Sequence, residues 1–441
     1  MRTTDNNYGQ SLSEILDKNE EYEYADLEAI ANKTISKLCE ENPNLLIFPQ
    51  TLGGHNDEIG KSAIFEFRED KIFTENIMGF VGRNKMQITI HSRFYEKDND
   101  YFLHYLLSKV FSINIFKFEQ RQDKESIWDF LLYLFPHYLK KALSLGLYKE
   151  YRSNKYNDSN FRGAIDINRH IKLNTPFAGK IAYTMREYNF DNKINQLIRH
   201  TLEYIKTHKF GRGVLNSNNG VAADVDKIIF HTPSYNKKDL QKTIKANLKP
   251  ISHPYFAEYK MLQQICLQIL RKDKISFGVD KNQIYGLLFD GAWLWEEYLN
   301  KIFIEHNLGF THAENKTDKN PLYLFEGKKH SQYPDFYKKS NFIADAKYKG
   351  LENRAYNDDL HQIISYMYIE KAHLGGFIYP ISANSHNSEI SEKVGILNGY
   401  GGVVKKWGLK IAQNAPSFAA FKDKMKENEN NFVSELRKHQ T

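Results

Sequence analysis

The order of apolar patterns after residue 250 restricts the fold of this chain more than any other feature of its sequence. Two segments with the apolar spacing of helices come first, then three short strand-like segments, a further helix and a strongly apolar strand. These segments lie at 254–272, 292–307, 322–325, 334–337, 341–348, 358–371 and 375–380. Because this order lets helices cover a sheet, residues 251–441 are predicted to form an α/β domain.

Residues 1–250 carry a different pattern, which predicts an α+β region in two parts. Residues 1–100 join a helix predicted at Ala25–Cys39 to short strand-like segments separated by glycines, as expected of a small β-rich module. Residues 101–250 contain long apolar segments with helical spacing and are predicted to be mainly helical. Pro250 and Pro254 favour a domain boundary near residue 250.

The net charge of +7 is distributed unevenly along the 441 residues. Residues 1–100 hold 11 Lys and Arg against 19 Asp and Glu, residues 101–250 hold 25 against 13, and residues 251–441 hold 25 against 22. A basic middle region suits a polyanion such as DNA, or a docking face for a partner. The alternative interpretation is a solvated surface rich in lysine, and charge alone does not separate the two.

Composition excludes several classes of protein. Cys39 and Cys266 are the only cysteines, which excludes a disulfide framework and a four-cysteine zinc site. The 16 histidines show none of the spacings of transition-metal sites. No apolar run approaches the roughly 18 residues of a membrane span, and residues 1–20 lack the basic and apolar parts of a secretory signal. We therefore expect a reduced, soluble, cytoplasmic protein without a membrane partner.

A glycine-containing segment at Gly54–Ser62 resembles a phosphate-binding loop but has the wrong spacing. Five residues separate Gly54 from Gly60, whereas the phosphate-binding motif has four. Such a loop wraps its backbone N–H groups around phosphates at the start of a helix, but the residues that follow Ser62 alternate like a strand. We therefore predict that a partner, and not this segment, binds any nucleotide that the protein uses.

The segment from Tyr333 to Lys347 carries candidate catalytic chemistry. Asp335 begins one strand-like segment, and Asp345 and Lys347 lie two residues apart at the end of the next. Residues two apart on a strand point to the same face, and a hairpin turned at 338–341 would bring Asp335 opposite Asp345. Two carboxylates suit a Mg²⁺ ion, and a lysine beside them can position or deprotonate a water and offset phosphate charge. This arrangement predicts metal-assisted hydrolysis of a phosphodiester.

An acid two residues before a lysine is by itself a weak signal, because the pattern recurs in this chain. It also occurs at Glu69, Asp191, Glu258 and Glu326. Asp345 differs from these because it closes an apolar strand, follows a Pro-Asp pair ten residues upstream, and comes after a helix that contains acidic residues. The alternative interpretation, a strand that ends in a solvated Asp–Lys pair, stays open on these residues alone.

With its neighbours, this segment resembles the PD-(D/E)xK nuclease superfamily. The segments at 289–299, 333–336, 343–350 and 358–367 resemble the McrC family, the nuclease subunits of modification-dependent and related restriction systems. Asp290 and Glu296 fit the acidic helix of that family, although Gly291 and Trp295 stand where the family usually has Met and Phe. A looser likeness at 79–94, 161–171 and 187–198 extends the resemblance over most of residues 45–380.

The resemblance implies a role for each matching acid and lysine. Asp335 and Asp345 would be Mg²⁺ ligands, and Lys347 would be the catalytic lysine. Glu296 would be a further acidic ligand, directly or through water, with the adjacent Glu297 as the competing choice.

Three residues around this set have less definite roles. Gln362 and Tyr366 fit the Gln-x-x-x-Tyr pair of the family, one helical turn apart. Gln362 would contact the substrate phosphate or the attacking water, unless it is a helix-surface amide, whereas Tyr366 fits packing better than catalysis. Lys349 either contacts DNA or ends the strand in solvent.

The resemblance also implies a partner. Members of the family dock onto a ring-forming AAA+ GTPase of the McrB type and stimulate its hydrolysis of GTP, so GTP would be bound by the partner and residues 1–250 would form the docking half. Four arginines lie in the family-like segments and either reach the partner's nucleotide or form surface ion pairs. They are Arg83, Arg93, Arg162 and Arg169.

The expected function is therefore a Mg²⁺-dependent endonuclease subunit of a phage-defence restriction system, which cleaves double-stranded DNA when assembled with that GTPase. Two alternatives stay open. The first is an autonomous repair or type II-like endonuclease, and the second is a mainly non-catalytic subunit that activates a partner GTPase.

Overall fold

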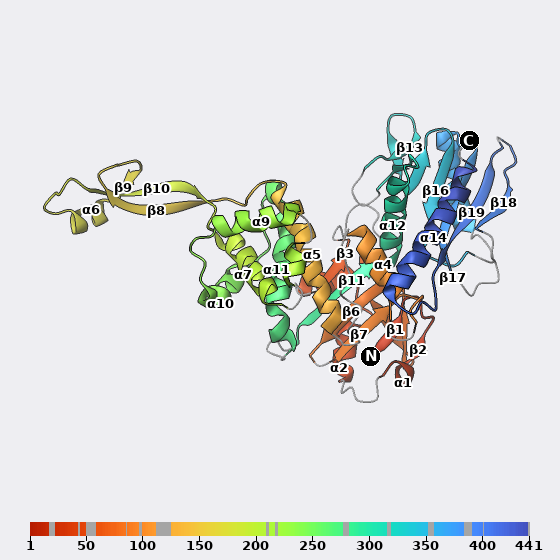
Figure 1. Cartoon of the computed structure of the whole chain (residues 1–441), viewed down its shortest axis with the longest axis horizontal. Coiled ribbons are helices and arrows are strands. Elements are labelled where there is room, and N and C mark those ends of the chain that lie inside the picture. Colours follow the sequence, from red (N-terminus) through yellow and green to blue (C-terminus); the bar gives the residue numbers. More distant parts are fainter. Residues whose placement is uncertain are drawn as a thin grey trace. The chain divides into compact units, whose positions relative to one another are not determined.

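Two units, each connected more densely within itself than to the other, make up the computed structural model of this chain (Figure 1). Unit 1 comprises Met1–Ile127 and Lys274–Thr441, and unit 2 comprises Trp128–Asp273. The predicted boundaries near residues 100 and 250 both fall inside these units. The residues that the structure describes are 1–16, 23–42, 45–49, 59–84, 86–96, 99–111, 125–208, 211–216, 219–276, 282–314, 319–351, 357–382, 390–399 and 401–439.

A six-stranded mixed sheet in unit 1 contains the predicted strand–helix–strand order. Its strands, from one edge to the other, are β12 (Thr311–His312), β15 (Phe336–Lys338), β16 (Phe342–Ala346), β17 (Leu374–Ser382), β19 (Val403–Ile411) and β18 (Ser391–Ile396). β15 and β16 form the predicted antiparallel hairpin, whereas β16, β17 and β19 are parallel. Helix α13 (Asn357–Glu370) connects β16 to β17, since parallel neighbours need a crossover connection.

Apolar packing fixes α13 against this sheet. Ile363, Tyr366 and Met367 repeat with helical spacing and are buried in one core cluster with Ile343 of β16 and Phe377 of β17. This packing holds the first turn of α13 near the end of β16.

A second mixed sheet in unit 1 combines strands that are far apart in the sequence. Its order is β1 (Arg2–Thr4), β7 (Met86–His91), β6 (Ile77–Arg83), β11 (Ile284–Asp290) and β3 (Leu45–Phe48). β11 is buried along its whole length and pairs with β6 and β3, so a strand beyond residue 250 belongs to the sheet of the N-terminal module. A small sheet of β2 (Gln10–Ser11), β5 (Lys71–Thr74) and β4 (Phe65–Arg68) accompanies it.

The helix predicted at Ala25–Cys39 is wrong as one element. The structure has two helices there, α2 (Tyr24–Ile30) and α3 (Ile35–Glu41). Asn32 breaks the run: its φ of 59° is left-handed, and its side-chain amide pairs with both the backbone N–H and the carbonyl of Phe67 at 3.0 Å. Residues 54–58 of the glycine-containing segment lie outside the described residues, and Ile59–Lys61 forms a short 3₁₀ turn.

Three further helices of unit 1 meet at a buried carboxylate. The remaining elements of this unit are α1 (Leu12–Ile15), α4 (Tyr101–Val110), β13 (Leu322–Phe325), β14 (Lys329–Gln332), α12 (Gly291–Glu305) and α14 (Phe418–Arg437). Glu429 of α14 accepts hydrogen bonds from the hydroxyls of Tyr105 in α4 and Tyr298 in α12, both at 2.7 Å. Its other oxygen lies 3.4 Å from the ammonium of Lys109.

Replacing Glu429 by Ala is expected to lower the free energy of unfolding by about 3 kcal/mol. The change leaves two buried hydroxyls without an acceptor, each at about 1 to 3 kcal/mol. Replacing Glu429 by Gln keeps an acceptor oxygen and is expected to cost less. Urea denaturation followed by tryptophan fluorescence measures both variants, and equal losses for Ala and Gln would contradict this account.

Unit 2 combines a group of helices with an extended sheet. The helices are α5 (Glu125–Leu143), α7 (Lys193–Thr207), α8 (Gly211–Leu215), α9 (Asn219–Phe230), α10 (Leu240–Ala246) and α11 (Glu258–Ser276), with 3₁₀ turns at Lys237–Asp239 and Pro254–Phe256. No helix in the described part of the whole chain is both long and apolar enough to cross a membrane.

The sheet of unit 2, with a short helix, forms an arm that comprises residues 150–189. It consists of β8 (Glu150–Asp158), β10 (Ile181–Asn189), β9 (Ala164–Ile165) and α6 (Ile167–Leu173). Figure 1 shows this arm running outward from the helices of the same unit. The prediction of a mainly helical region at 101–250 missed these strands. Residues on both faces of β8 are exposed, so its sequence lacks the apolar alternation that marks a half-buried strand.

Two asparagines at the start of α7 hold both ends of the arm. The side-chain amide of Asn195 donates to the carbonyls of Tyr148, just before β8, and of Phe190, just after β10, at 2.9 and 2.7 Å. Asn192 also donates to the Tyr148 carbonyl and caps α7 by accepting from Ile194. The arm is therefore fixed at its base to a helix of its own unit.

Candidate active site

Asp335 and Asp345 lie together at one end of the β15–β16 hairpin. The register pairs Phe336 with Ala344, so the next step of the same ladder sets Asp335 opposite Asp345. The carboxylate of Asp335 accepts a hydrogen bond of 2.6 Å from the backbone N–H of Ala346. Asp345 is buried, with 3% of its surface exposed. The hairpin thus brings together the two acids that the sequence singled out.

The surroundings of Asp335 raise its pKa to about 7. Burial is the main cause, and the negative charge of Asp345 acts in the same direction, whereas Lys347 and the N–H of Ala346 oppose the shift. Two carboxylates that crowd each other in a buried place favour a shared proton or a cation. The donor set therefore fits a hard divalent ion such as Mg²⁺, which prefers oxygen ligands and keeps several waters.

Lys347 completes the set. Its ammonium lies 2.5 Å from Asp345, 2.9 Å from the side-chain oxygen of Gln362 and 3.4 Å from Asp359. Burial alone would lower the pKa of Lys347, but Asp345 and Asp335 outweigh that effect and raise it. The lysine is therefore an ammonium ion at neutral pH, which suits charge stabilisation better than proton removal.

Gln362 links Lys347 to Tyr366 on one face of α13. Its side-chain oxygen accepts from Lys347, and its amide donates to the Tyr366 hydroxyl at 2.9 Å. Tyr366 is buried, with its hydroxyl 3.5 Å from the Tyr333 carbonyl. Both polar atoms of Gln362 are thus engaged with protein in this structure, and Tyr366 packs in the core as expected.

Glu296 and Glu297 approach the aspartates through His312. The Nδ1–H of His312 donates to the Asp335 carbonyl at 2.7 Å, and Nε2 lies 3.5 Å from Glu296 and 3.8 Å from Glu297. Burial lowers the pKa of His312, but Glu297 and Asp335 together outweigh this effect, so the pKa lies above its ordinary value. The two glutamates have nearly equal side-chain exposure, 24% and 23%, so the geometry does not favour one over the other.

The two aspartates stand as a pair in this conformation. Within the described ranges, no three His, Cys, Asp or Glu side chains come close enough together to hold a metal ion. Glu296 and Glu297 contact the imidazole of His312, which in turn binds the backbone carbonyl of Asp335.

Comparison with known proteins agrees with the resemblance read from the sequence. The model of the McrBC 5-methylcytosine restriction system component family matches residues 72–380, more than two thirds of the chain. The chain belongs to this family.

One solved structure extends the likeness at the level of the fold. A chain of the refined half-complex from a tetradecameric assembly of Thermococcus gammatolerans McrB AAA+ hexamers with bound McrC is similar over 99% of both chains, with a TM-score of 0.54 and 14% identity. The cryo-EM structure of the Thermococcus gammatolerans McrBC complex matches 71% of this chain and 89% of that chain, with a TM-score of 0.34 and 12% identity. No curated protein matches the chain.

Two residues of this candidate site were missed in the sequence. His312 gave no signal in the sequence. It belongs to no metal-binding spacing, and it meets Asp335 because its strand, β12, pairs with β15. Asp359 had a usable signal: it lies three residues before Gln362, which places both on one face of the same helix.

The four arginines singled out in the sequence have local partners in the chain. Arg83 lies 3.1 Å from Asp26, Arg93 lies 2.6 Å from Asp5, and Arg169 lies 3.7 Å from Asp166. Reorienting the amide of Asn160 lets its oxygen accept from Arg162. The ion-pair interpretation therefore accounts for Arg83, Arg93 and Arg169 within this chain.

Arg93 also contacts the residue next to Lys347. Its guanidinium covers the ring of the buried Tyr348 at 4.3 Å and donates to Asp5 and to the side-chain oxygen of Asn76. Asp5 is fully buried, and this burial raises its pKa to about 6 in spite of Arg93. The turn that follows β7 thus supports the chain position after Lys347.

Replacing Arg93 by Met is expected to lower the free energy of unfolding by about 3 to 5 kcal/mol at pH 7.5, because it leaves Asp5 buried without its cation. The folded-state pKa of Asp5 lies above the ordinary value of 3.8, so this acid's contribution to stability is present below that value and is lost as the pH rises through about 6. We therefore expect a smaller loss at pH 5. Adding Asp5→Asn should restore part of the stability, and no recovery in urea denaturation would contradict the pairing.

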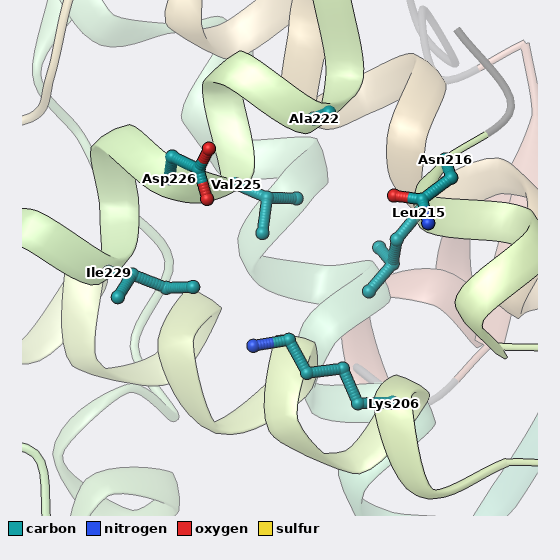
Figure 2. Close-up of a pocket in the computed structure, with 7 residues that line it drawn as sticks. All are labelled: Lys206, Leu215, Asn216, Ala222, Val225, Asp226 and Ile229. Atoms are coloured by element: carbon teal, nitrogen blue, oxygen red, sulfur yellow. The ribbon is translucent and has the colours of Figure 1, made fainter. Parts of the chain in front are cut away.

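Unit 2 contains a cavity of about 360 Å³ between α7, α8 and α9. Figure 2 shows Lys206 reaching toward the space bordered by Val225 and Ile229, with Asp226 on another side. Lys206 is also 3.0 Å from Glu203. Among the described residues that line this cavity, Asp226 is the single carboxylate. They therefore lack the pair of carboxylates that the hairpin in unit 1 provides.

Proposed function

We propose that this McrBC-family chain is the nuclease subunit of a restriction system and cleaves DNA with Mg²⁺. The observation that carries the proposal is the meeting of Asp335, Asp345 and Lys347 at the end of one hairpin and beside Gln362, with Asp345 buried and the other two half-buried. An exposed Asp–Lys pair would have supported the solvated-strand interpretation, but Asp345 is buried. The antiparallel β15–β16 hairpin, followed by α13 and the parallel β17, supports a PD-(D/E)xK fold.

The contacts of each residue support a separate role in this reaction. Asp335 and Asp345 would hold the Mg²⁺ ion, which supplies Lewis-acid stabilisation of the phosphate and a more acidic bound water. Lys347, as an ammonium ion, stabilises the negative charge that develops on the scissile phosphate. Gln362 orients the lysine through its side-chain oxygen. Glu296, or Glu297 beside it, would contribute an acidic ligand through water, and His312 holds the Asp335 backbone in place.

The partner in this proposal is a GTPase of the McrB AAA+ type. The solved assembly with the same overall fold contains McrB AAA+ hexamers with bound McrC. The arm supports a protein-docking role, because it carries large apolar side chains that are 45% to 67% exposed. These are Phe161, Ile165, Ile167, Ile171, Leu173 and Phe177.

The test is reconstitution with the GTPase that accompanies this chain in its source. We expect cleavage of double-stranded DNA only when this chain, the GTPase, GTP and Mg²⁺ are all present, and faster GTP turnover in the presence of this chain. Methylated and unmethylated DNA are compared in parallel. Cleavage by the purified chain with Mg²⁺ alone would instead identify an autonomous endonuclease. GTPase stimulation with no cleavage of any DNA would contradict the nuclease assignment.

A further inference from the structure

Lys347 and the proposed metal compete for one carboxylate. The ammonium of Lys347 lies 2.5 Å from the Oδ2 atom of Asp345, which is one of the two acids that would hold the ion. An ammonium and a divalent ion cannot both sit against that oxygen without strong repulsion. For the site to load, the lysine must therefore move off Asp345 and yet stay within reach of the phosphate.

Asp359 offers the lysine a second anionic contact. Its Oδ1 already forms an ion pair with the Lys347 ammonium at 3.4 Å, and rotation about the last torsions of the lysine side chain would shorten this contact. Its other oxygen is 2.7 Å from the ammonium of Lys349. The Asp359 side chain is only 9% exposed, so solvent screens this contact weakly.

The position of Asp359 is set by the fold. It lies in the first turn of α13, whose next turns are held in the core by Ile363 and Met367. A carboxylate is electrostatically favourable at this end of a helix. Gln362, one turn further on, meets the same ammonium from the same helix at 2.9 Å.

We propose that Asp359 is a positioning residue that receives the ammonium of Lys347 when a divalent cation occupies Asp335 and Asp345. In this role, Asp359 and Gln362 of α13 bind the lysine, and the two aspartates of the β15–β16 hairpin bind the metal. Because it concerns the lysine of the proposed nuclease site, this role depends on the proposed function.

The role predicts an effect on metal affinity that acts only through Lys347. In Asp359→Asn, Lys347 loses Asp359 as an anionic partner and keeps Asp345. Its ammonium therefore competes more strongly with the cation for the carboxylate of Asp345. We expect the dissociation constant for the ion to rise roughly tenfold or more, in the range seen when an outer-shell partner of a metal ligand is removed. In a Lys347→Met background, the competition is gone, and adding Asp359→Asn should change the affinity little.

The experiment measures Mn²⁺ binding to the purified full chain without DNA or GTP, from the EPR signal of free Mn²⁺. Asp345→Asn defines background binding, and Asp358→Asn is the matched control, because Asp358 is an exposed acid in the same helical turn. Asp359→Glu keeps the carboxylate and should bind Mn²⁺ nearly as the wild type does. Thermal unfolding of each variant establishes that it is folded.

Three results would overturn the role. Wild-type affinity for Mn²⁺ in Asp359→Asn would show that the lysine needs no second anionic partner. An equal loss of affinity with and without Lys347 would show that Asp359 acts by another route. If the wild-type chain bound no more Mn²⁺ than Asp345→Asn, the proposed metal site would itself fail, which separates that failure from a failure of Asp359 alone.

Discussion

Replacing Asp345 by Asn is expected to lower the rate of DNA cleavage by the reconstituted complex by about a thousandfold. The loss follows from removing one of two carboxylates that would hold Mg²⁺: the ion's stabilisation of the transition state is worth several kcal/mol, and about 4 kcal/mol corresponds to about a thousandfold in rate. Lys347→Gln should cost roughly a hundredfold to a thousandfold, as expected for one electrostatic contact in the transition state.

The asparagine side chain in Asp345→Asn has nearly the volume of the aspartate that it replaces, so the buried strand should keep its packing. The change also removes the repulsion between the two carboxylates, whereas Lys347 retains Gln362 and Asp359 as partners. We therefore expect the stability of the Asp345→Asn variant and its stimulation of the partner's GTPase to match those of the wild type. A single-turnover cleavage assay with supercoiled DNA measures the rate.

The matched control is Glu326→Gln. Glu326 lies two residues before a lysine, as Asp345 does, but it is exposed at the turn between β13 and β14. Its replacement should leave cleavage unchanged. If Asp345→Asn cut DNA as fast as the control, another site in the complex would have to be the nuclease.

The candidate site was predictable because its residues are close in sequence. Asp335 and Asp345 flank one tight hairpin, and Asp345 and Lys347 share the end of one strand, so local periodicity was enough to bring them together. The short helix–strand order around them also predicted α13 and β17. His312 joins this site from a separate strand, and no local pattern announces such a contact.

Other parts of the fold depended on contacts that local patterns do not report. β11 joins the sheet of β3 and β6 although it lies far from both along the chain, and that pairing is visible only in three dimensions. Asn32 breaks a run of helical spacing because its side chain finds a partner in the distant Phe67. The strands of the arm carry no apolar alternation, since both faces of β8 are exposed.

Because the arm is exposed, substitutions on it are expected to have a second large effect, on binding of the GTPase. In the double variant Ile167→Asp and Ile171→Asp, two carboxylates replace side chains of α6 that are 67% and 58% exposed. α6 has no buried residue, so the fold of the chain should be unaffected. If the arm docks onto the GTPase, burying these charges should weaken binding by at least about 2 kcal/mol per central contact, or about a thousandfold for the pair.

The measurement is the affinity of the labelled chain for the GTPase by fluorescence anisotropy, together with GTP turnover at a fixed concentration of both proteins. Phe230→Asp is the matched control, because Phe230 is 78% exposed and ends α9 of the same unit outside the arm. We expect this control to bind and stimulate as the wild type does, whereas the α6 variant loses GTPase stimulation and DNA cleavage together. Wild-type affinity in the α6 variant would contradict docking through α6, because its two most exposed apolar side chains would then contribute nothing to binding.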